Sequence, residues 1–195
     1  PQVFGDGIQR DASGNLLTVS APSKLNIASR SSESMDFKVG YAFDTARNGS
    51  FTVEATAVRT LQLEDVIVPG VDPIQLAGAI EGPDRWRWIL GAQWDHGNFS
   101  THLALNGSSS YRNYFRNRFV TQNPPKVDGY RTVDLTVNYT VPARQGILAG
   151  TRMTVGARNL FDEPFPFADT YLGPFDPTRV DPRGQVAFFE WRKLF

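Results

Sequence analysis

Cysteine is absent from this chain of 195 residues, so disulfide bonds and thiolate metal sites are excluded. Only two histidines occur, His96 and His102, which leaves little for a metal cluster. Basic and acidic residues both number 20, so the net charge gives no indication of a nucleic-acid partner. No apolar run approaches the roughly 18 residues that a membrane-spanning helix needs. We expect no metal, no other cofactor and no nucleic acid.

A signal peptide is also missing, and the chain begins with Pro1 in place of methionine. We therefore expect the chain to be a piece of a longer protein. On this interpretation the missing signal carries no information about where the whole protein resides.

Apolar and polar residues alternate with a period of two along most of the chain, which is typical of strands with one apolar and one polar face. Between residues 33 and 43, for example, Phe37 and Val39 alternate with Asp36 and Lys38. No convincing helix is predicted, and residues 1–30 are either a small hairpin or a loop. The predicted strands are 33–43, 51–63, 85–95, 99–108, 130–141, 151–158 and 185–195.

The same alternation assigns side chains to the two faces of the predicted strands. The apolar face is predicted to carry Phe37, Val53, Leu90, Leu103, Leu135, Val155 and Phe189. The polar face is predicted to carry Asp36, Glu54, Gln93, His102, Asp134, Arg158 and Glu190. Within 51–63, parity also places Leu61 and Leu63 on the apolar face, together with Phe51.

The connections between these strands alternate between short (44–50, 95–98 and 142–150) and long (about 66–84, 113–129 and 161–184). In up-and-down order, all long connections lie at one end of the sheet. Structureless loops beyond roughly 12–15 residues are uncommon in compact soluble domains. Outer-membrane barrels, in contrast, combine short periplasmic turns with long extracellular loops. We predict an all-β fold, an antiparallel up-and-down transmembrane β-barrel segment. A soluble β-sandwich is the alternative, because its strands alternate too.

The last quarter of the chain carries more specific motifs. It reads "VGARNLFDEPFPF" and then "FDPTRVDPRGQVAFFEWRKLF", which resembles the terminal region of TonB-dependent receptors of the Gram-negative outer membrane. Upstream, "LNIASRSSESMDFKVGYAFDT" is similar to the same family, although Ser34 and Met35 stand before Asp36 where the family usually has a glycine. The residues that match the terminal motifs are Asn159, Leu160, Phe161, Asp162, Glu163, Asp181, Pro182, Arg183, Gly184 and Phe195. Asn159 and Asp162 are turn formers that can bond to nearby backbone, so we expect them to form a turn that ends the preceding strand.

The resemblance implies an outer-membrane transport receptor that takes up a scarce nutrient, such as a siderophore, cobalamin or a carbohydrate. Residues 1–30 would be an extracellular loop or a lead-in to the first strand, and residues 31–195 the C-terminal part of the barrel. About seven strands would belong to a barrel of about 22 strands. The implied partners are outer-membrane lipid and lipopolysaccharide, the barrel-assembly machinery, and the missing strands and plug of the same receptor. TonB would be contacted only through that plug, since neither a plug nor a TonB box is present. The alternative function is a soluble carbohydrate-binding module whose Trp-rich strand 86–94 forms a sugar platform.

Arginines interleaved with aromatic residues in two long connections are the candidate ligand-binding residues. Such a mixture can bind an anionic siderophore or the phosphates of lipopolysaccharide, although it is also typical of a solvated interfacial rim. The candidates are Arg112, Tyr114, Arg116, Arg118, Phe167 and Tyr171.

The C-terminal aromatic residues are the candidate assembly signal. Phe189, Trp191 and Phe195 share one parity, and a terminal phenylalanine resembles the signal that the barrel-assembly machinery recognises. Catalysis is not predicted: Ser100 and His102 lie on one polar strand face near Asp95, as polar residues of such a face do by chance.

Overall fold

The computed structural model describes residues 8–14, 16–19, 29–66, 71–114, 126–142, 146–170 and 172–193. These residues form an all-β structure dominated by one antiparallel sheet of eight strands. In the described part of the chain, the only helical element is one 3-10 turn. The elements are β1 (Ile8–Arg10), β2 (Leu16–Val19), β3 (Ser29–Thr45), β4 (Gly49–Val66), β5 (Ile74–Gln75), β6 (Trp86–His96), β7 (Phe99–Ser108), β8 (Tyr111–Arg112), β9 (Lys126–Val127), β10 (Arg131–Thr140), η2 (Gly146–Leu148), β11 (Thr151–Arg158) and β12 (Val186–Lys193).

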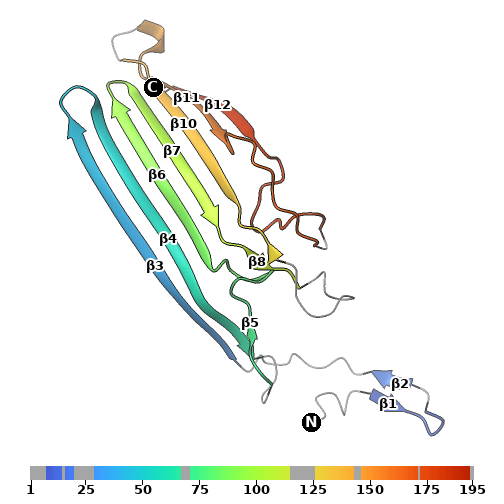
Figure 1. The fold of residues 1–195 in the computed structure, drawn as a ribbon. Coiled ribbons are helices and arrows are strands. Elements are labelled where there is room, and N and C mark those ends of the chain that lie inside the picture. The colour runs from blue at the N-terminus through green and yellow to red at the C-terminus, as the bar shows by residue number, and fades with distance from the viewer. Residues whose placement is uncertain are drawn as a thin grey trace.

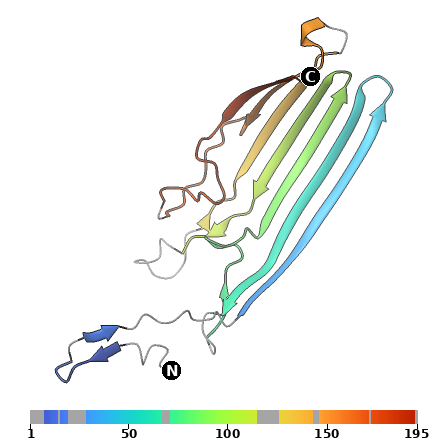
Figure 2. The same ribbon diagram turned by 180° about the vertical axis from the view of Figure 1, so that it is seen from behind.

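Seven strands of the main sheet follow one another in the order β3, β4, β6, β7, β10, β11 and β12, as Figures 1 and 2 show from two sides. The eighth, β5, pairs with the end of β4. Short pairs form two further sheets, β1 with β2 and β8 with β9. The predicted all-β, antiparallel, up-and-down order is therefore confirmed.

The connections lie at the two ends of the sheet as predicted. Those following β3, β6 and β10 are short and meet at the upper end in Figure 1. Those following β4, β7 and β11 span 67–85, 109–130 and 159–185, and their described parts lie at the opposite end. Lys193 donates a hydrogen bond to the carbonyl of Ile147, so β12 finishes beside η2 at the short-turn end.

The predicted division of side chains between the two faces is also confirmed. Directly opposed residues of an antiparallel pair share a face. The ladder joins Val53 to Ala92, Ala92 to Leu103, and Leu103 to Leu135, so one apolar side runs across these strands. The same ladders join polar residues such as His102 and Gln93 on the other side. Both predicted sets lie on the sides assigned to them.

A β-bulge in β4 overturns one part of this prediction. Leu61 is an extra residue with no partner on β3, because Thr60 and Gln62 pair with consecutive β3 residues. One inserted residue moves every later side chain to the other face. Gln62 and Glu64 therefore lie on the apolar side of the sheet. Leu63 lies on the polar side, although parity predicted the apolar side.

Strands β3 and β4 also extend further than predicted. Their pairing begins with Ser29 opposite Val66 and ends with Thr45 opposite Gly49. The first part was not predicted, because residues 29–34 are all polar and show no alternation. Arg30 and Asp65, opposed across this extension, form a two-point ion pair with N–O distances of 2.5 and 2.6 Å. The extension beyond the bulge is thus mostly polar, with Leu63 and Val66 as its apolar residues, and projects past the apolar part of the sheet.

The apolar side of the sheet is exposed. Val39 is 67% exposed, Tyr41 69% and Phe189 66%, although each is apolar or aromatic and lies within a strand. In the described residues, no second layer of strands or helices packs on this side, and the sheet is open, with β3 and β12 as its edges. No helix long and apolar enough to cross a membrane occurs in this part of the chain. Contiguous exposed apolar surface of this kind marks a surface that another phase or partner covers.

Two glycines let aromatic rings lie flat on the sheet. Gly107 is opposed to Trp88 across the β6–β7 ladder, and a Cβ atom there would stand 2.2 Å from the indole ring. Gly156 is opposed to Phe188 in the same manner, with a ring atom 2.4 Å from the same hypothetical Cβ. An aromatic side chain that covers a cross-strand glycine compensates for its missing side chain.

We expect Gly107→Ala to lower the free energy of unfolding by about 1–3 kcal/mol, because the added methyl group displaces the Trp88 ring from its position. Gly40→Ala is the matched control, since a Cβ there meets its nearest atom only at 3.8 Å. Denaturant unfolding of the refolded protein, followed by tryptophan fluorescence, measures both. Equal stability of the two variants would contradict the role assigned to Gly107.

Candidate functional site

The three long connections pack together over one end of the sheet. Ile80, Tyr111, Val127 and Ala168, which come from all three connections, form a buried apolar cluster. The Asn113 side chain donates a 2.8 Å hydrogen bond to the carbonyl of Asp169, which ties the second connection to the third. This end of the molecule therefore has a small core of its own, apart from the open sheet.

Arg179 is the central polar residue of this loop end. Its Nε lies 2.7 Å from Asp84 Oδ1, and its NH1 pairs with Asp176. Its NH2 donates hydrogen bonds to the carbonyls of Ala79 and Gly82 at 3.0 and 2.6 Å. The guanidinium lies over the Tyr111 ring, 4.0 Å from its centroid. One side chain thus joins residues that are about 100 positions away in sequence.

Burial of this charge is compensated by its partners. The side chains of Arg179, Asp84 and Asp176 are 6%, 5% and 4% exposed. Burial alone lowers the pKa of Arg179, but the hydrogen bonds and charges of the two aspartates outweigh it, and the pKa is raised. Burial likewise raises the pKa of Asp176, while hydrogen bonds from Thr178 and Arg179 bring it below its ordinary value. Arg179 and Asp176 therefore both keep their charges at neutral pH, because paired charges tolerate burial where single ones do not.

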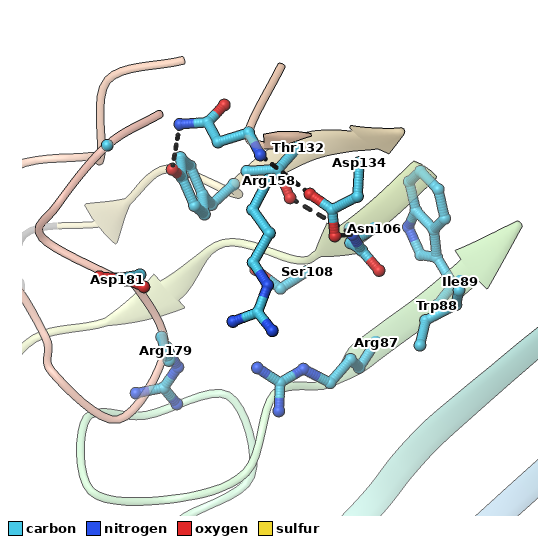
Figure 3. A pocket seen from close by; sticks show the side chains of 14 residues that line it. Arg87, Trp88, Ile89, Asn106, Ser108, Thr132, Asp134, Arg158, Arg179 and Asp181 are labelled. Atoms are coloured by element: carbon cyan, nitrogen blue, oxygen red, sulfur yellow. Dashed lines mark hydrogen bonds between the residues drawn. The ribbon is translucent and has the colours of Figure 1, made fainter. Parts of the chain in front are cut away.

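A cavity of about 470 Å³ lies beside this network, on the polar side of the sheet. Its floor comes from β6, β7, β10 and the end of β11, and its wall from the third long connection (Figure 3). Pockets of this size hold small-molecule ligands in other proteins. The polar and charged lining residues are Arg87, Asn106, Ser108, Tyr130, Thr132, Asp134, Arg158, Asn159, Arg179 and Asp181.

The turn after β11 builds part of the cavity wall. The Asn159 backbone N–H donates to Asp134 Oδ1 at 2.9 Å, and its side chain accepts from the Glu163 N–H at 2.9 Å. Both Asn159 and Asp162 adopt positive φ, at 49° and 52°, a conformation that Asn and Asp tolerate better than most residues. Asp162 accepts a 2.9 Å hydrogen bond from the Gln185 N–H, which joins the turn to the start of the last strand. The sequence prediction that Asn159 and Asp162 form a turn is therefore confirmed.

Two arginines of the cavity have unused hydrogen-bond donors. Arg158 makes no side-chain hydrogen bond or ion pair with any described residue. Arg87 has a single, long ion pair, with Nε 3.8 Å from Asp84 Oδ2. Figure 3 shows both guanidinium groups turned toward the same space between the sheet and the third connection. Guanidinium groups present five N–H donors each, so this space is rich in donors that are exposed and that no described residue accepts.

The predicted ligand-binding residues lie elsewhere. The Arg112 guanidinium stacks over Tyr114, 5.4 Å from the ring centroid, and Phe167 is 62% exposed beside the buried Ala168. These three lie at the loop end but do not line the cavity. Arg116, Arg118 and Tyr171 lie outside the described residues, so the proposed ligand set stays a prediction.

Two of the three predicted assembly residues are described. Phe189 and Trp191 lie on the apolar side of β12, 66% and 54% exposed, and Phe195 lies outside the described range. Their shared face is as predicted, and the assembly role stays a prediction.

Sequence reasoning placed Arg158 on the polar face but did not single out Arg87, Arg179 or Asp84 as site residues. The contact between Arg179 and Asp84 joins residues 95 positions apart, and no local pattern marks either of them. Alternation could have identified Arg87 as a residue of the polar side of β6, because it immediately precedes Trp88, which lies on the apolar side.

Comparison with models of protein families, with curated proteins and with solved structures gives no match to this chain. The resemblance to TonB-dependent receptors rests on the sequence motifs and stays a prediction.

We expect Arg179→Gln to loosen the loop end, because it leaves two buried carboxylates without their cation. Breaking a buried ion pair costs about 3–5 kcal/mol. Limited proteolysis should cut the 159–185 connection much faster in this variant than in the wild type. Arg183→Gln is the control in the same connection, since the Arg183–Asp181 pair is exposed and should matter little. Equal cleavage rates in both variants would show that Arg179 does not hold the loops.

The phenol of Tyr111 should ionise near pH 12, because burial, and next the charge of Asp176, raise its pKa from 10.0 to about 12. Between these two values the unfolded chain loses the proton while the folded chain keeps it, so stability should fall as pH rises through this window. Phenolate absorbance compared between wild type and Tyr111→Phe isolates this group. A titration of the unfolded chain is the control, and a difference that is complete near pH 10 would contradict the assignment.

Proposed function

We propose that this chain is a section of the wall of an outer-membrane β-barrel, from a TonB-dependent type of transport receptor that takes up a scarce nutrient such as a siderophore, cobalamin or a carbohydrate. The observation that carries the proposal is the exposed apolar side shared by the seven consecutive strands. Water disfavours such a surface by roughly 25 cal/mol per Å² of apolar area, and lipid does not. A transmembrane barrel faces lipid with this side and water with the other.

The dimensions of the apolar side support this proposal. On β3 it runs from Met35 to Phe43, nine positions, and a tilted membrane strand needs about 9–11 residues. Aromatic residues lie toward one end of it, where Phe43, Phe51 and Trp94 form a stacked row beside the short turns. Aromatic girdles of this kind mark the membrane interface of outer-membrane barrels.

The two ends of the sheet also fit a barrel. Long connections with their own core at one end, and short turns at the other, match the extracellular and periplasmic sides of outer-membrane barrels. The polar extension of β3 and β4 past the bulge would stand outside the bilayer. The open edges, β3 and β12, need further strands to close the barrel, since unpaired edges are not tolerated in lipid. These strands would come from the remainder of the receptor.

The soluble β-sandwich is the less supported alternative. A sandwich buries its apolar side against a second sheet about 10 Å away. Within the described residues, no such sheet covers the apolar side, and β1–β2 and β8–β9 are short pairs of two to four residues per strand.

Leu103 and His102 give a matched test of the lipid-facing side, because they are neighbours on β7 with opposite orientations. We expect Leu103→Arg to cost about 2–4 kcal/mol in a bilayer, because the charge enters the hydrocarbon region, whereas His102→Arg adds charge to a water-facing side and is tolerated. Refolding of the full-length protein into lipid vesicles, followed by denaturant unfolding, measures both.

Equal tolerance of the two substitutions would contradict the barrel assignment. The same would follow if the full-length protein were monomeric and cooperatively folded in buffer without detergent or lipid.

A further inference from the structure

We propose that the cavity between Arg87 and Arg158 binds a carboxylate or phosphate group of an anionic ligand. The inference rests on the proposed function in one respect, namely that the polar side of the sheet faces a water-filled interior.

The first support is the convergence of the two arginines. Arg87 lies on β6 and Arg158 at the end of β11, with β7 and β10 between them. At about 4.8 Å per spacing, their strands lie about 14 Å apart. The two residues are also offset along the strands by about four residues, since Ala157 is level with Leu135, Leu103 and Ala92. Both side chains nevertheless turn across the intervening strands toward one space (Figure 3). Two like charges repel each other, and an anion between them removes that repulsion and satisfies their donors.

The carboxylates near the cavity already have other partners. Asp134 accepts hydrogen bonds from the Asn106 side chain at 3.0 Å and the Asn159 N–H at 2.9 Å. Asp181 is paired with Arg183. The hydrogen bond from Arg183 is the main reason that the pKa of Asp181 is lowered to about 2, and the charge of Arg158 contributes least to this lowering.

Asp84 is likewise engaged, through Oδ1 at 2.7 Å from Arg179. Its second oxygen is 3.8 Å from Arg87, beyond hydrogen-bonding range. The donors of Arg87 and Arg158 are therefore left for a group from outside the described chain.

Ser108 provides a neutral donor at the right place. It lies directly opposite Arg87 in the β6–β7 ladder and lines the cavity. Its hydroxyl makes no hydrogen bond with any described residue. Carboxylate and phosphate oxygens accept several hydrogen bonds at once, so a hydroxyl beside two guanidinium groups suits either.

The test is calorimetric titration of the full-length protein in detergent with citrate and, separately, with inorganic phosphate. Arg158→Gln and Arg87→Gln should each weaken binding roughly tenfold or more, the effect of losing a charged hydrogen bond. Arg158→Lys keeps the charge and should fall between the wild type and Arg158→Gln. Preference for citrate or for phosphate would identify which group the ligand carries.

Arg152→Gln is the matched control. Arg152 lies on the same strand and the same side as Arg158 but at the short-turn end, where its Nε donates to Asn138 at 3.3 Å. It should change affinity less than twofold. Far-ultraviolet circular dichroism of every variant establishes that the sheet is intact.

Lack of saturable binding of both anions to the wild type would overturn the proposal, as would equal weakening by Arg152→Gln and Arg158→Gln. Vesicle flotation of the same preparation tests the membrane assignment separately. A protein that binds citrate through Arg158 but does not associate with lipid would refute the barrel and leave the anion site standing.

Discussion

Seven neighbouring strands turn their apolar side chains to the same side of one sheet, and no described residue covers them. This exposed apolar side constrains where the polar side chains, the backbone hydrogen bonds and the long connections can lie. Polar groups must gather on the opposite side, and the backbone must be fully paired wherever the sheet meets an apolar phase. The long connections must leave from one end, where they can build a separate polar and apolar core without covering the sheet.

The loop end satisfies the last condition through charge as well as apolar packing. Its apolar cluster is small, so Arg179 supplies the cohesion, with hydrogen bonds to both flanking aspartates and to two carbonyls of the first connection. Because Asp84 is held by Arg179, the neighbouring Arg87 is left largely unpaired. The network that stabilises the loops thereby also creates the donor-rich cavity that we assign to an anion. The pairing of Arg179 with Asp84 thus underlies both the packing of the loops and the proposed anion binding.

The fold was more predictable from sequence than the site. Alternation indicates, residue by residue, which side of the sheet a side chain faces, so the sides taken by Phe37, Val53 and Leu103 follow from parity alone. Leu63 was misplaced because a bulge leaves no compositional mark: Leu61 is an ordinary strand residue that merely lacks a partner. The ligand set chosen from arginines mixed with aromatics stays a prediction. The cavity depends on side chains of four strands and of the second and third connections, which meet only in the folded chain.

The sequence by itself determined the seven main strands, their two faces, the order of short and long connections, and the Asn159–Asp162 turn. Each of these depends on interactions between near neighbours or on a repeating pattern. Only the tertiary structure decided the bulge at Leu61, the burial of Arg179 between Asp84 and Asp176, and the convergence of Arg87 and Arg158. Those features need contacts between residues far apart in the chain, and the free energy of such contacts is not written in any local stretch.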